Sequence, residues 1–202
     1  MRRSLLLVLG FILLAGEAAT AQTLGTPVFM SPYRSFRHSE LAGYISDPGS
    51  GYSIALEGEY RRAWPKFDGG LRAAYLDLNG SLGSRFAVGA DVRAPLAHRN
   101  ESFPLDASFT LGASFADGDG SSLFLIPVGV TLGRRILLEG SNTSFVPYVH
   151  PVIAPAFGGG NSDVNFGLGL GVNISFTQQL DLRVSGALGD YEGVAIGVAW
   201  HR

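Results

Sequence analysis

The sequence contains no cysteine and a single lysine, Lys66, among 202 residues. Without cysteine the chain has neither disulfides nor thiolate metal ligands, so its fold depends on hydrogen bonds and packing. Soluble sheet proteins commonly protect exposed edge strands with lysine and keep a charged face toward solvent. The scarcity of lysine beside 28 glycines therefore favours a closed sheet.

Long apolar runs are also missing from the body of the chain, where none approaches the about 18 residues of a transmembrane helix. The nearest, Leu123 to Leu132, is interrupted by proline and glycine. At the N-terminus, two arginines precede an apolar stretch from Leu5 to Ala15 and a small-residue site at Ala19-Thr20-Ala21. This pattern predicts a secretory signal peptide over residues 1–21. If the rest of the chain enters a membrane, it does so as strands.

Positive charge is too sparse for a nucleic-acid partner. Cleavage after Ala21 leaves 13 basic and 16 acidic residues, a net charge of −3, whereas a phosphate backbone requires clustered Lys and Arg. The mature length of about 180 residues suits one domain. We therefore divide the mature chain into a lead segment at residues 22–35 and one domain at residues 36–202.

From residue 36 onward the chain consists of short alternating segments separated by turn residues, which indicates an all-β sandwich or barrel. Two segments, Leu71–Leu78 and Val146–Ile153, are ambiguous in phase. We predict ten antiparallel strands, or eight if the first segment and one ambiguous segment are dropped. The ten segments are Phe36–Ser46, Tyr52–Trp64, Leu71–Leu78, Arg85–Leu96, Leu105–Phe115, Phe124–Leu132, Val146–Ile153, Val164–Phe176, Leu180–Leu188 and Val194–Trp200.

The stretch Val164–Phe176 shows how the two faces differ. Large apolar residues occupy every even position, and glycine, asparagine or serine every odd one. A phosphate-binding loop would need Gly-x-Gly-x-x-Gly before a helix, but these glycines have period two and no helix pattern follows. Phe166 and Phe176, ten residues apart on the apolar face, would span about 25 Å in a tilted strand, which matches a membrane barrel.

The small and polar second face decides between a soluble sandwich and a membrane barrel. A sandwich would carry long charged side chains into water on that face. Small residues with sparse charges instead suit a narrow interior, with the apolar face turned to lipid. The sequence thus predicts a single antiparallel transmembrane β-barrel. A soluble lipocalin-like carrier, with its large side chains inside, is the alternative.

Val164 to Leu188 forms two long amphipathic segments that meet at the short turn Thr177-Gln178-Gln179. In this pattern the chain resembles the small outer-membrane β-barrel proteins of Gram-negative bacteria, of the type of the OmpA transmembrane domain and OmpX. The resemblance implies a barrel domain over residues 36–202 in the cell outer membrane, with outer-membrane lipid, lipopolysaccharide and the assembly machinery as partners. The family typically ends on an aromatic residue, whereas here Trp200 is third from the end. The oligomeric state stays open.

With ten strands and the Thr177 turn in the periplasm, the connections Ala97–Pro104 and Ile136–Thr143 would also face the periplasm. This conflicts with the usual pattern of short periplasmic turns and long outer loops.

Charged residues of both signs fall on the predicted inner face. In a narrow lumen each must be paired or hydrated, because a lone desolvated ion costs several kcal/mol. We therefore expect a polar network that fills and orders the interior of a non-enzymatic barrel with a structural or surface-interaction role. A narrow channel for ions or small solutes is the alternative. The predicted network consists of Glu57, Glu59, Arg61, Asp91, Arg93, Asp106, Asp181 and Arg183.

An outer-membrane lipid hydrolase is a further alternative, because His38-Ser39-Glu40 contains the residue types of acyl transfer. Adjacent strand residues face opposite sides, however, so Ser39 and His38 cannot share one wall. The four histidines, His38, His98, His150 and His201, show no metal-ligand spacing, and Asp117-Gly118-Asp119-Gly120 is better explained as a hairpin turn than as a calcium loop. We expect no enzyme activity, cofactor or metal.

Overall fold

A computed structural model describes residues 24–49, 51–79, 83–118, 120–159 and 161–202. The predicted signal peptide at residues 1–21 lies outside the described residues. Within these ranges, no helix is long and apolar enough to cross a membrane.

In these ranges, twelve strands make up one antiparallel sheet. Strands are favoured because β-branched and aromatic residues alternate with small ones, so every segment presents one large face and one small face. The strands are β1 (Ser39–Asp47), β2 (Tyr52–Ala63), β3 (Asp68–Leu78), β4 (Ser84–Ala97), β5 (Asp106–Gly118), β6 (Ser121–Leu125), β7 (Val128–Gly133), β8 (Ile136–Leu137), β9 (Ser144–Gly158), β10 (Asn161–Ser175), β11 (Leu180–Gly189) and β12 (Val194–His201).

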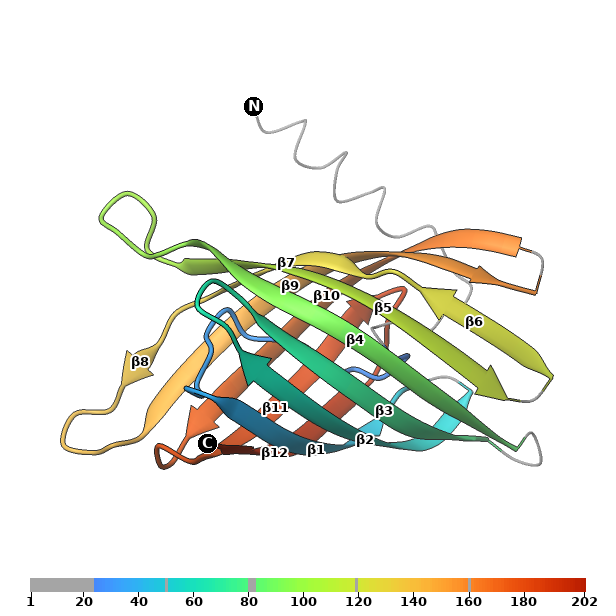
Figure 1. Cartoon of the computed structure of the whole chain (residues 1–202), viewed down its shortest axis with the longest axis horizontal. Coiled ribbons are helices and arrows are strands. Elements are labelled where there is room, and N and C mark those ends of the chain that lie inside the picture. Colours follow the sequence, from blue (N-terminus) through green and yellow to red (C-terminus); the bar gives the residue numbers. More distant parts are fainter. Residues whose placement is uncertain (1–23, 50, 80–82, 119, 160) are drawn as a thin grey trace.

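The sheet closes into a barrel because β1 pairs with both β2 and β12 (Figure 1). The twelve strands occupy ten positions around it. β6 and β7 each pair with β5 and β9, so they form one strand position, interrupted at Ile126-Pro127. β8 pairs with the start of β9 alone and extends that edge. The prediction of a ten-stranded closed antiparallel barrel is confirmed.

Most large apolar side chains point outward and most small or polar side chains inward, although a few large ones, such as Leu76, Leu125 and Tyr148, are buried in the lumen. In β10, for example, Phe166 and Leu170 are exposed on the outside, whereas Asn165 and Asn173 are buried inside. An exterior this apolar suits lipid rather than water. It is the reverse of the arrangement that a soluble carrier of apolar ligands requires.

The predicted faces are wrong at the start of β2. Strict alternation along Tyr52–Trp64 predicts Tyr52 and Ile54 on the outer face and Ser53 on the inner one, but Tyr52 is buried and Ser53 is exposed. The register against β3 shifts between Tyr52 and Ile54, which marks a β-bulge that moves the faces by one residue. From Ile54 onward the observed faces are those predicted.

Aromatic side chains surround the exterior near both ends of the barrel. Trp64, Phe67, Phe176 and Trp200 lie exposed near the end where β12 finishes, and Tyr75, Phe86, Phe115, Phe124, Phe157 and Phe166 near the other. Neighbouring rings pack on one another, as Trp64 does on Phe67, with centroids 5.0 Å apart. Two such belts flanking an apolar band are characteristic of transmembrane barrels.

The two rims differ in their connections (Figure 1). The rim at which β1 begins and β12 ends, here the C-terminal rim, carries the connections at residues 64–67, 98–105, 134–143 and 176–179. The distal rim carries those at residues 48–51, 79–83, 119–120, 159–160 and 190–193. Both of the longer connections, at residues 98–105 and 134–143, therefore share a rim with the C-terminus. This agrees with the arrangement predicted from the sequence, in which the long connections lie on the same side as the Thr177 turn.

Candidate functional site in the barrel lumen

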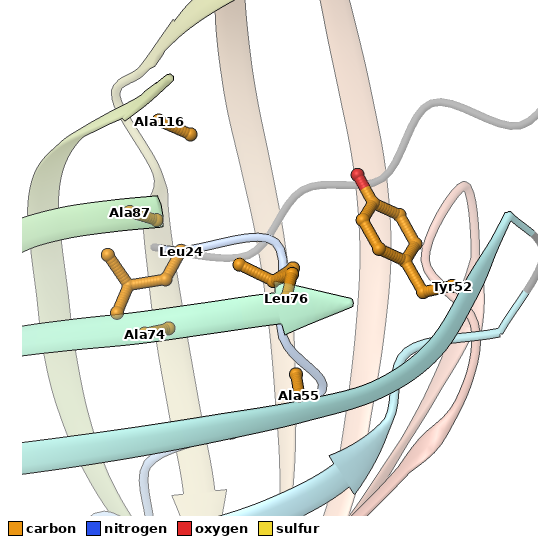
Figure 2. Close-up of a cluster of buried hydrophobic side chains, with 7 residues drawn as sticks. All are labelled: Leu24, Tyr52, Ala55, Ala74, Leu76, Ala87 and Ala116. Atoms are coloured by element: carbon orange, nitrogen blue, oxygen red, sulfur yellow. The ribbon is translucent and has the colours of Figure 1, made fainter. Parts of the chain in front are cut away.

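The lumen is filled by the chain itself. Residues 24–38, here called the plug, run inside the barrel without helix or strand before β1 begins. Leu24, Val28 and Phe29 are each at most 5% exposed. Leu24 packs at the distal rim among Ala55, Leu76 and their neighbours, as Figure 2 shows. The plug thus enters at the distal rim and leaves at the C-terminal rim. The sequence predicted a lead segment over residues 22–35 but not that it lies in the lumen.

Side chains of the barrel wall satisfy the backbone carbonyls of the plug. Such carbonyls would otherwise be buried without partners, at a cost of about 1–3 kcal/mol each. The donors come from strands on several sides of the lumen, so they fix the plug at many points. Ser185 Oγ donates to Pro27 O (2.6 Å), Tyr148 OH to Phe29 O (3.0 Å), Ser108 Oγ to Pro32 O (2.8 Å), and Arg93 Nη1 to Ser31 O and Tyr33 O (2.8 Å each).

The plug also donates hydrogen bonds to the wall. Thr26 Oγ1 donates to Glu57, and Ser35 Oγ donates to Asp181 at 2.8 Å. The Met30 amide approaches His150 Nδ1 at 3.4 Å. Polar contacts of the plug are therefore distributed along its length rather than concentrated at one end.

The glycines of β10 form the groove that receives aromatic rings. A Cβ built on Gly169 would lie 1.9 Å from Phe29 Cδ1. One on Gly167 would lie 1.7 Å from the ring of Tyr191, and one on Gly171 2.4 Å from the ring of Tyr148. Real Cβ atoms cannot approach so closely, so the period-two glycines are required by the close approach of rings inside the barrel.

All eight charged residues proposed from the sequence lie on the lumen side, and seven are buried. The eighth, Arg183, has a side chain 13% exposed. Arg61 lies at the centre of the largest group: its Nη1 approaches Glu59 (2.8 Å) and Asp91 (2.5 Å), and its Nε donates to Asp68 (2.9 Å). The five N–H donors of a guanidinium group allow one arginine to contact several carboxylates in this way.

A second arginine, Arg72, completes this group. It contacts Glu57 (2.9 Å), Glu59 (3.0 Å) and Asp91 (2.9 Å). Glu59 and Asp91 are thus shared between Arg61 and Arg72. Charges removed from water to this degree persist because each has a partner of opposite sign.

Arg93 connects the charged wall to the plug. Its Nε and Nη2 donate to Asp68 Oδ2 (3.0 and 2.9 Å), while its Nη1 holds the carbonyls of Ser31 and Tyr33. One side chain therefore orients both the network and the chain that passes it.

Asp106 lies nearer the C-terminal rim and is not joined to that network. It accepts hydrogen bonds from the Tyr33 hydroxyl of the plug and, at 3.2 Å, from the Arg99 amide. Burial raises the pKa of the Tyr33 phenol, and the hydrogen bond to Asp106 raises it further. Tyr33 thus stays a neutral donor at physiological pH.

A second ionic cluster joins the first strand to the last two, and Arg183 Nη1, 4.0 Å from Glu59 Oε2, connects it to the first group. Arg183 Nη1 donates to Glu40 at 2.8 Å and its Nη2 lies 3.7 Å from Asp181. His201 Nε2 lies 3.0 Å from Glu40 and 3.2 Å from Asp181. Because Glu40 is on β1, Asp181 and Arg183 on β11 and His201 on β12, the cluster ties the strands at which the barrel closes.

Glu40, Asp181 and His201 also present possible metal-ligand atoms within 4.8 Å of one another. The guanidinium of Arg183 already binds Glu40 and lies close to Asp181. A metal ion would have to share this space with that fixed cation, so the arrangement suits an ion-pair cluster better than a metal centre.

The residues considered for acyl transfer do not form a catalytic group. His38 is exposed at the rim, whereas Glu40 is buried in the lumen with Arg183 and His201. His150 Nε2 does contact a hydroxyl, that of Thr110, at 2.8 Å. Both of these side chains are buried beside the plug.

The cavities described between plug and wall are small beside Met30 and wider at the C-terminal rim. Two cavities beside Met30, each of about 10 Å³, lie within the described part of the lumen, enough for about one water molecule each. A wider cavity of about 230 Å³ opens at the C-terminal rim between Tyr33, Phe67 and His98.

The sequence did not identify Arg72, Asp68, Glu40 and His201 as members of the charged network in the lumen. Arg72 lies in the segment of ambiguous phase, and Asp68 was assigned to no strand. Charge balance was a usable signal, because the three predicted carboxylates of Glu57, Glu59 and Asp91 outnumber the predicted cations near them. Such an excess of buried carboxylates calls for a further arginine on a neighbouring strand.

Comparison with known proteins gives a likeness in fold. No protein-family model and no curated protein matches the chain. Among solved structures, it is similar to the beta domain of the Bordetella autotransporter BrkA, with a TM-score of 0.54, 14% identity, and coverage of 81% of this chain and 98% of that one. A de novo designed transmembrane β-barrel matches with a TM-score of 0.40 and 15% identity over 81% of this chain and 96% of that one. Neisserial surface protein A (NspA) matches with a TM-score of 0.31 and 12% identity over 80% and 93%.

Proposed function

We propose that this chain is an outer-membrane protein whose barrel is non-conducting and non-enzymatic, with a structural or surface-interaction role in the cell envelope. The observation that carries the proposal is the plug: residues 24–38 cross the lumen and are held by donors from several strands. An apolar exterior with two aromatic belts supports membrane insertion. The ionic network rigidifies the interior rather than lining an open path.

Planar-bilayer conductance tests the closed lumen directly. We expect the refolded, full-length mature barrel to give no steady current steps, and a variant lacking residues 24–34 to conduct. Gly43→Ala is the matched control, because a Cβ there meets nothing within 4 Å and the barrel should stay silent. Steady openings of the unaltered barrel that change with Arg93→Gln or Arg183→Gln would instead identify a narrow channel.

Two further assays separate the remaining roles. Incubation with lipopolysaccharide, followed by mass spectrometry, should detect no released acyl chains, and their release would identify a lipid hydrolase. In cells, loss of the protein should increase leakage of periplasmic enzymes, with recovery on re-expression. Unchanged leakage would remove the structural role and leave surface interaction.

A further inference from the structure

The two rims of the barrel carry opposite charge. Seven exposed cations lie on the C-terminal rim, where the exposed carboxylates among the described residues are Glu101 and Glu139. The distal rim shows the reverse: Arg85 is its one described cation beside Asp47, Asp77, Asp117, Asp163, Asp190 and Glu192. Six of these cations, all except Arg34, are here called the basic collar: Arg37, Arg62, Lys66, Arg99, Arg134 and Arg202.

The basic collar lies at the level of the aromatic belt on its rim. The Arg202 guanidinium is 5.4 Å from the centroid of the Trp200 ring, a cation–π contact. Arg62 is exposed on β2 two residues before Trp64, which is itself exposed. Aromatic belts mark the membrane–water interface, so these guanidinium groups lie where lipid phosphates lie.

Four of the six collar cations are also free to bind. The side chains of Arg62, Lys66, Arg99 and Arg134 form no hydrogen bond or ion pair within the described part of the chain. Arg34 and Arg135, by contrast, are engaged: Arg34 Nη1 donates to Trp64 O at 2.7 Å, and Arg135 stacks on Tyr33 at 4.8 Å. Unpaired cations at a membrane interface attract anionic headgroups.

An exposed apolar tip lies next to the collar. Ile136, Leu137 and Leu138 are 47%, 72% and 45% exposed and directly follow Arg134 and Arg135. Apolar side chains beside a basic pair are the composition of segments that rest in the interface of an anionic membrane. The connection at residues 134–143 therefore adds apolar contact to the charge of the collar.

Charge and loop length together indicate which rim faces the periplasm. The rim that crosses the bilayer during insertion must carry its polar groups through hydrocarbon, where Arg and Lys cost more than Asp and Glu. The distal rim, with shorter connections and with carboxylates, crosses at lower cost than a rim with longer connections and seven exposed cations. A barrel inserting from the periplasm would leave the basic collar on the periplasmic side.

We propose that the basic collar binds the phosphate groups of anionic phospholipid in the periplasmic leaflet and holds that rim at the entry side of the membrane. The inference rests on the outer-membrane insertion in the proposed function. It is independent of the closed lumen, because a conducting barrel could still bind lipid and a silent barrel could fail to.

Native mass spectrometry of the refolded barrel in a non-ionic detergent tests the proposal. Micelles are titrated with phosphatidylglycerol, phosphatidylcholine, lipid A or inorganic phosphate. We expect phosphatidylglycerol to bind most tightly, and the quadruple variant R62Q/K66Q/R99Q/R134Q to weaken its binding by about tenfold or more. The charge-conserving variant R62K/R99K/R134K should retain most of the affinity, and R85Q at the distal rim should leave it unchanged.

Each other outcome overturns the proposal. Equal binding of phosphatidylcholine removes the electrostatic preference, and tighter binding of lipid A or of free phosphate removes the phospholipid as source. An equal loss in R85Q removes the assignment to the collar. Should the quadruple variant fail to fold, the salt dependence of phosphatidylglycerol binding to the unaltered barrel tests the proposal instead. At about 1 M salt the screening length falls to about 3 Å. Binding that persists there is not electrostatic and overturns the proposal.

Discussion

The Phe29 ring occupies the space that a side chain on Gly169 would need, since a Cβ there would lie 1.9 Å from Phe29 Cδ1. Phe29 belongs to the plug and Gly169 to the middle of β10. The bare inner face of β10 and the filled lumen are therefore one feature. A strand with larger inner residues would exclude the plug, and a barrel without the plug would leave this face lining a cavity.

Gly169→Val should displace the plug. The added side chain collides with the ring of Phe29, which is held in place through its own carbonyl by Tyr148. We expect steady conductance in planar bilayers and faster protease cleavage within residues 24–38. Gly58→Val is the control, because a Cβ at residue 58 meets nothing within 4 Å. A silent, protease-resistant Gly169→Val barrel would show that the plug tolerates the collision.

Arg72 should contribute strongly to stability because three carboxylates depend on it. Arg72→Met leaves Glu57, Glu59 and Asp91 short of a buried cation, and we expect the free energy of unfolding to fall by about 3–5 kcal/mol. Urea unfolding in phospholipid vesicles, followed by tryptophan fluorescence, measures the change.

Arg62→Met is the matched comparison, since Arg62 is exposed and unpaired. It should change the same free energy by no more than about 0.5 kcal/mol. If both substitutions changed the free energy of unfolding equally, the ion pairs of Arg72 in the buried network would contribute nothing measurable to stability. Adding Glu57→Gln to Arg72→Met should recover part of the loss, because one uncompensated charge is then removed.

The path of the plug predicts opposite sides for the two ends of the described chain. Leu24 lies at the distal rim and Arg202 at the C-terminal rim. An epitope inserted directly before Leu24 should be labelled by antibody on intact cells, whereas one added after Arg202 should be labelled only after permeabilisation. Labelling of both epitopes under the same condition would contradict the path through the lumen, and reversed labelling would contradict the assigned orientation.

The parts of this structure that the sequence predicts are those with strict period two. In β10, β11 and β12 a large apolar residue alternates with a small one, so lipid face and lumen face can be assigned without knowing the neighbours. The faces cannot be assigned where neighbouring residues do not differ in size and polarity in this way: Arg72, Ala73 and Ala74 give no phase by themselves. The assignment also fails at Tyr52, where a bulge changes the face and only the register against β3 reveals it.

The plug could not be predicted because its burial is decided by the barrel around it. Residues 24–38 have no periodicity, and prolines at positions 27 and 32 remove two of the backbone donors that pairing would use. Only the assembled wall supplies the donors that satisfy its carbonyls. For the same reason Glu40 and His201 could be paired only after β1 met β12 and the barrel closed.

The seam between β7 and β9 is expected to be the weakest in the barrel. The carbonyl oxygens of Pro147 and Pro155 accept from Arg134 N (3.3 Å) and Ile126 N (3.0 Å). In an antiparallel strand the N–H and C=O of a residue point to the same side, so these prolines, and Pro151 in the same phase, present their nitrogens to this seam. No proline can donate there, and the pairing of β7 with β9 skips Val130 and Thr131.

Pro151→Val should therefore strengthen the barrel. Continuing the register of Gly129 with Val152 sets residue 151 opposite Val130, so the new N–H gains the Val130 carbonyl as its acceptor. Pro151 is exposed on the lipid face, where valine fits without repacking. We expect the free energy of unfolding to rise by about 1 kcal/mol and amide exchange in β7 to slow. A restored donor that left both quantities unchanged would show that the missing hydrogen bonds do not limit the stability of this seam.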